Sequence, residues 1–158
     1  MLMVVLWIVI FGVMVGFRSM LPMALLSFGA WRGSIPLGGT KLAFLGNPFL
    51  MGLLILAALF EIALDKRPTT PNRTMPAGLT VRAVMGALGG AALAVAALEP
   101  WWKGSLAGLV GALFGAMLGY SLRQFFVDSF RCKDVYVAVG EDLVTFVGVT
   151  WVFMHIQM

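Results

Sequence analysis

Four carboxylates interrupt otherwise apolar segments of this chain: Glu61, Asp65, Glu141 and Asp142. Glu61 and Asp65 are four residues apart, so they share one face of a helix. Glu141 and Asp142 lie about two turns into a later apolar segment. An ionisable group among apolar residues is costly, and it usually faces the protein interior or water, where it can carry a proton or bind a cation. These carboxylates are therefore the candidate residues for binding an ion or a charged solute.

Three arginines are placed to act as charge partners: Arg18, Arg82 and Arg123. In a structural interpretation, Arg82 pairs with Glu61 or Asp65, Arg123 pairs with one of the later acids, and the pairs fix the helix register. In a functional interpretation, unequal surroundings leave one carboxylate able to exchange a proton or a cation. Glu141 is the best single candidate for this role, because it is predicted to lie deepest among the acids.

The composition explains why these charges stand out. The chain has 158 residues, of which 61% are hydrophobic and 11% are charged. A soluble domain of this length has about 25% charged residues. The outer surface is therefore predicted to face lipid, and the length suits one polytopic membrane domain over residues 1–158.

Several function classes lack their characteristic residues. His155 is the only histidine, so a metal cluster or histidine-based catalysis is not expected. The sequence contains no phosphate-binding loop and no Ser/His/Asp set, and we expect neither enzyme activity nor a cofactor. The net charge of +4 is scattered among the apolar segments. This distribution suits the headgroups of a lipid bilayer and not a nucleic acid.

The elements that must position these residues are helices. A span needs about 20 apolar residues. Five segments approach that length: 2–17 with an apolar continuation at 20–31, then 48–64, 78–98, 105–122 and 135–156. The predicted fold is an all-α integral membrane protein, a compact bundle of about five transmembrane helices. The stretch "EPWWKG", 99–104, is predicted to be a tight turn with two tryptophans at headgroup depth.

The stretch "GFRSMLP", 16–22, predicts a break in the first helix near Arg18–Pro22. An unbroken helix over 2–31 would be about 44 Å long, which exceeds the hydrocarbon thickness. Pro22 also disfavours helix just before it. Residues 20–31 are then expected to bend back as a re-entrant or interfacial segment. Arg18 could bind an anion or a lipid phosphate there, or it could extend to the interface, which we favour.

Basic residues in the short connections predict the orientation. They are most frequent in 65–76 and near 131–133, which places these connections in the cytoplasm. With five complete spans, the N-terminus would be cytoplasmic and the C-terminus would lie outside.

Glycine and alanine recur at helical spacing in "GALGGA", 86–91, and "GALFGA", 111–116. Such faces allow helices to approach closely within the molecule, in a homo-oligomer, or around a pore. Residues 11–17 and 114–120 also share the pattern F-G-x-M-x-G-aromatic. Because five spans would make these two helices antiparallel, the pattern is compatible with a partial inverted repeat.

Four polar landmarks together resemble the bacterial membrane-protein family of unknown function DUF4126. They are "GFRSMLP" (16–22), the spacing ExxxDK (61–66), "RAVMGAL" (82–88) and "GEDLVTF" (140–146). The resemblance implies a compact, multi-pass protein of the bacterial inner membrane. It implies no activity and no functional residues.

Two hypotheses for function follow. The first is a transporter or channel-like protein for a proton, an ion or a small charged solute, which uses the carboxylates and their arginine partners. The second is a non-catalytic accessory or scaffold subunit that packs on a larger membrane complex or on lipids. Lipid-processing chemistry is the weakest alternative, because no nucleophile–base pair is visible.

Overall fold

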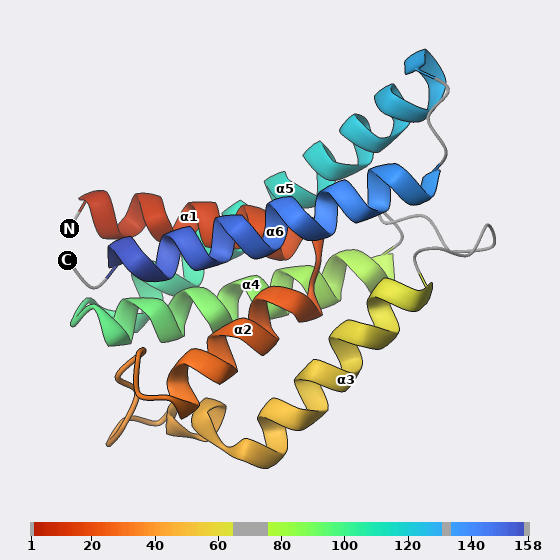
Figure 1. Ribbon diagram of the computed structural model, residues 1–158. Coiled ribbons are helices and arrows are strands. Elements are labelled where there is room, and N and C mark those ends of the chain that lie inside the picture. Colours follow the sequence, from red (N-terminus) through yellow and green to blue (C-terminus); the bar gives the residue numbers. More distant parts are fainter. Residues whose placement is uncertain (1, 65–75, 131–133, 157–158) are drawn as a thin grey trace.

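The computed structural model describes residues 2–64, 76–130 and 134–156 (Figure 1). In these ranges the chain forms helices and no strand. The elements are α1 (Leu2–Phe17), α2 (Met20–Trp31), the short 3-10 helix η1 (Ala43–Gly46), α3 (Pro48–Leu64), α4 (Pro76–Ala96), α5 (Trp101–Phe130) and α6 (Asp134–Ile156). The prediction of an all-helical fold is confirmed, but the described ranges hold six α-helices and not five.

The additional helix arises because the first apolar segment is broken where the sequence predicts it. α1 ends at Phe17 and α2 begins at Met20, so the break falls at Arg18 and Ser19. Pro22 lies in the first turn of α2, where its missing N–H removes no helical hydrogen bond. α2 then runs back toward the end of the bundle at which α1 begins (Figure 1).

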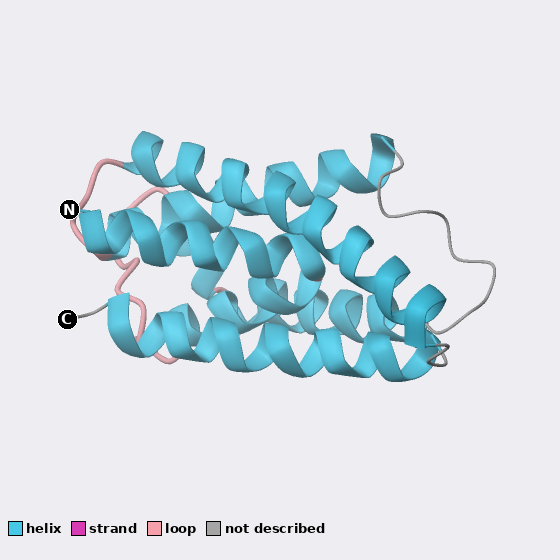
Figure 2. Ribbon diagram, turned by 90° about the horizontal axis from the view of Figure 1, so that it is seen from above, coloured by secondary structure: helices cyan, strands magenta, loops and turns pink. Residues whose placement is uncertain are grey.

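The two chain ends lie together as a result. Trp7 of α1 and His155 of α6 have ring centroids 5.1 Å apart, and Phe11 and Phe153 have ring centroids 6.2 Å apart. The beginning of α1 therefore packs beside the end of α6 (Figures 1 and 2). The prediction placed the two ends on opposite sides, but they lie at the same end of the bundle because α2 reverses the direction of the chain after Ser19. The basic connections 65–75 and 131–133 lie outside the described residues.

α1 packs against α4, α5 and α6, and glycines bring the α1 and α5 backbones close together. A Cβ atom added to Gly12 would lie 2.5 Å from the carbonyl oxygen of Gly108, and one added to Gly16 would lie 2.5 Å from that of Ala112. Residue numbers rise together along both helices, so α1 and α5 run parallel. An inverted repeat requires antiparallel copies, and that prediction is wrong because the reversal at Ser19 changes the direction of every later helix.

Among the described residues, three helical segments are long and apolar enough to cross a membrane: Pro76–Ala96, Trp101–Val127 and Tyr136–Ile156. α1, α2 and α3 are apolar but shorter. α5 extends beyond the predicted segment at both ends, and Trp101 and Trp102 lie in its first turn instead of in a connecting turn. Leu98, with φ of 58°, lies in the connection between α4 and α5.

Candidate charged site at the helix break

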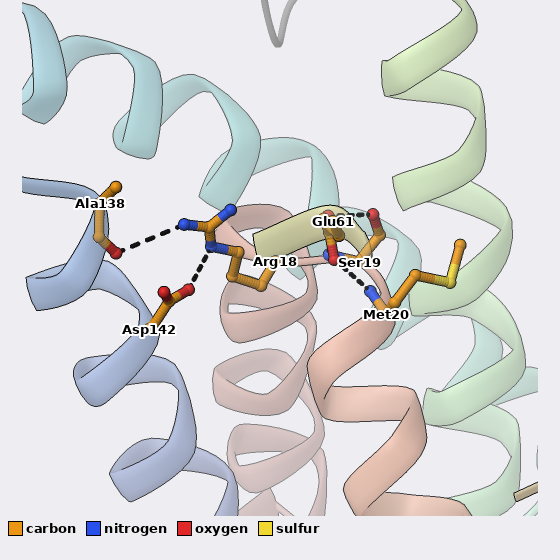
Figure 3. A network of polar contacts seen from close by, with 6 residues as sticks. All are labelled: Arg18, Ser19, Met20, Glu61, Ala138 and Asp142. Carbon is orange, nitrogen blue, oxygen red and sulfur yellow. Dashed lines mark hydrogen bonds and ion pairs between the residues drawn. The ribbon is translucent and has the colours of Figure 1, made fainter. Parts of the chain in front are cut away.

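The break between α1 and α2 is the place where charged residues of the bundle converge. The first amide groups of α2, like those of any helix, have no acceptor within the helix. Because α2 begins inside the protein, these amides need an acceptor from another element. Glu61 of α3 supplies one (Figure 3). Its Oε1 accepts hydrogen bonds from the amide and the hydroxyl of Ser19 at 3.0 and 2.8 Å, and its Oε2 accepts one from the amide of Met20 at 2.9 Å. A carboxylate at a helix N-terminus is also stabilised by the helix dipole.

The other side of the break is satisfied by α4. Gly16 lies in the last turn of α1, where carbonyl oxygens have no partner within the helix. The Nε of Arg82 donates to this carbonyl oxygen at 3.0 Å. Arg82 is buried, so its guanidinium is held at the end of α1 inside the bundle. α3 and α4 thus each provide a charged side chain that closes one of the two broken helix ends.

Arg18 lies within the break and points to α6 (Figure 3). Its side chain is 1% exposed, its Nε forms an ion pair with Oδ1 of Asp142 at 2.6 Å, and its Nη2 donates to the carbonyl oxygen of Ala138 at 3.3 Å. Asp142 is 18% exposed, so the acid lies nearer the surface than the arginine. The interpretation in which Arg18 extends to the membrane interface is wrong, because its charge is neutralised within the protein.

The remaining predicted residues surround this site to different extents. Glu141 lies on the wall of an open groove between α5 and α6. Arg123 is partly exposed on α5. Asp65 falls outside the described residues. Among the described residues, no group of three or more His, Cys, Asp or Glu side chains is arranged to hold a metal ion.

Some polar groups of the site were not identified from the sequence. Ser19 lies in the unusual "GFRSMLP" stretch, but its residue type does not indicate which group it contacts. The carbonyl oxygens of Gly16 and Ala138 belong to the backbone, so the residue types do not identify them as part of the site. Thr145 is fully buried one turn after Asp142, and its Oγ1 has no hydrogen-bond partner among the described residues. Its position three residues from Asp142 was the available signal, because such residues share a helix face.

In the described ranges, the fold and the site define a helical bundle with three helices of membrane-spanning length and a broken helix whose ends are closed by charged side chains. Residues 5–155 match the model of the family described as "Domain of unknown function (DUF4126)", and the chain belongs to this family. No curated protein and no solved structure matches the chain. The family carries no assigned activity, so the function has to be inferred from the site.

Proposed function

We propose that this protein transports a proton, an ion or a small charged solute through the charged site at the helix break. The observation that supports the proposal best is the buried Arg18–Asp142 ion pair, which lies beside the α2 N-terminus that Glu61 closes. Broken helices whose ends meet charged groups within the bundle are a recurring architecture of transporter binding sites.

The energetic cost of these charges supports a functional role. Each charged side chain in a span costs about 2.5–3.5 kcal/mol on insertion scales. Non-helical backbone within a membrane is tolerated where protein buries it or where it lines a wet cavity. Arg18 and Arg82 are both buried here, and the groups that hold them belong to different helices. A shift of α6 relative to α1 would therefore separate Arg18 from Asp142 and Ala138.

In the proposed mechanism, a transported ion competes with the charged residues of the site for their partners. A cation or a proton would compete with arginine for a carboxylate, and the sequence candidates are Glu61, Asp65, Glu141 and Asp142. An anion would compete with a carboxylate for an arginine or for the α2 amides. Arg18, Arg82 and Arg123 are the proposed charge partners.

A flux assay on purified protein in liposomes tests this function. Imposed gradients of protons, alkali cations and chloride are compared for wild type, Glu141→Gln and the control Glu99→Gln. Glu99 lies in the connection between α4 and α5, away from the helix break. We expect flux in wild type and in Glu99→Gln and its loss in folded Glu141→Gln. Unchanged flux in Glu141→Gln would remove this carboxylate from the mechanism.

One observation favours the second candidate function, an accessory or scaffold subunit. α3 packs mainly against α2, and it exposes a row of large apolar side chains: Phe49, Leu53, Leu56 and Phe60. Their spacing of three and four residues places them on one helix face. If wild type shows no flux and native membranes yield a stoichiometric larger complex that Leu56→Gln disrupts, the accessory function is favoured.

A further inference from the structure

An open groove of about 370 Å³ lies between the second half of α5 and the first half of α6. The two helices diverge in this region (Figure 1). The groove is lined by Phe17, Gly119, Leu122, Phe126, Tyr136, Val137, Gly140, Glu141 and Val144. Its volume falls within the range of about 300–1,000 Å³ that is usual for small-molecule sites.

The lining combines three aromatic side chains with one carboxylate. Phe17, Phe126 and Tyr136 contribute aromatic side chains to the lining, a residue type that attracts cations, and apolar residues form most of the remaining wall. Glu141 supplies negative charge at one point of this surface. From this complementarity we propose that the groove binds an amphipathic organic cation, a quaternary ammonium or phosphonium with an apolar body.

Two residues of the groove lining are sequence neighbours of the charged site. Phe17 directly precedes Arg18, and Glu141 directly precedes Asp142. The proposal that the cation binds is argued from the groove alone. The role of the cation as a transported solute rests on the proposed function.

Glu141 can accept a ligand in addition to contacts within the chain. A carboxylate has two oxygens with about four acceptor positions, so a contact from a neighbouring side chain leaves capacity for a cation. The adjacent groove floor is also open. A Cβ atom added to Gly140 would meet nothing within 4 Å.

Equilibrium binding of tetraphenylphosphonium to the full-length protein in lipid nanodiscs tests the proposal. Tetraphenylborate, an anion of nearly the same shape, is the matched probe. After subtraction of the binding to protein-free nanodiscs, we expect saturable binding of the cation, at least about tenfold weaker binding of the anion, and at least about tenfold weaker cation binding in Glu141→Gln. Equal binding of both ions, or no effect of Glu141→Gln, would overturn the proposed recognition of charge.

A pair of glycine variants tests the location. Gly140→Leu fills the groove, and Gly52→Leu adds the same side chain on α3, where a Cβ also meets nothing within 4 Å. We expect Gly140→Leu to weaken cation binding at least about tenfold and Gly52→Leu to leave it unchanged. Absence of saturable binding in wild type would overturn the proposed binding site. The transport function would then still be tested by the separate measurement of ion flux. Binding of the organic cation without flux of this cation, protons, alkali cations or chloride would retain the site and reject transport.

Discussion

Substitution of Asp142 by asparagine is expected to destabilise the protein by about 3 kcal/mol. Arg18 is 1% exposed and its Nε is 2.6 Å from Oδ1 of Asp142, so the variant leaves a buried cation without its anionic partner. Loss of one member of a buried ion pair costs about 3–5 kcal/mol. The lower value applies because asparagine keeps one oxygen that can accept a hydrogen bond.

The unequal exposure of the two side chains predicts an asymmetric mutant cycle. Arg18→Met leaves a carboxylate that is 18% exposed and can reach water, so we expect a smaller loss of about 1–2 kcal/mol. The double variant Arg18→Met/Asp142→Asn buries no unpaired charge and should be no less stable than Arg18→Met. Equilibrium unfolding in mixed micelles, followed by tryptophan fluorescence, measures all four proteins. Additive losses in the double variant, or a loss below about 1 kcal/mol in Asp142→Asn, would refute the pairing.

Two further predictions concern packing in the bundle. Gly16→Ala should cost about 1–3 kcal/mol, because its Cβ would lie 2.5 Å from backbone atoms of α5, whereas Gly52→Ala should gain about 0.5–1 kcal/mol from helix propensity. Similar unfolding midpoints for the two variants would contradict the close approach of α1 and α5. Thr145→Val should be neutral or stabilise by about 1 kcal/mol, because it removes a buried hydroxyl that has no partner in the described chain. A clear loss of stability in the same unfolding assay would indicate a partner for that hydroxyl.

The local features of this fold were predictable because they depend on neighbouring residues. Long apolar segments predicted the helices. The proline, arginine and serine in "GFRSMLP" predicted the break. Two consequences were missed because they depend on the direction of the chain after the break. The reversal at Ser19 places both chain ends together and makes α1 parallel to α5.

The sequence predicted which charged residues form the site better than it predicted the partner of each residue. Arg18, Glu61 and Asp142 were identified because ionisable residues among apolar ones need partners. Which groups meet could not be deduced, since Glu61 binds backbone amides and Arg82 binds a backbone carbonyl. Backbone amides and carbonyl oxygens become available as partners only where a helix is broken. The sequence does not indicate which charged side chain will contact them.

Amide hydrogen exchange across residues 17–22, measured in nanodiscs, tests most directly whether the break is closed by Glu61. The amides of Ser19 and Met20 donate to its carboxylate at 3.0 and 2.9 Å, so both should be protected in wild type although no helical acceptor serves them. Glu61→Ala should accelerate their exchange by about tenfold or more, and Glu99→Ala should not. Rapid exchange of both amides in wild type, or equal protection with and without Glu61, would contradict the account.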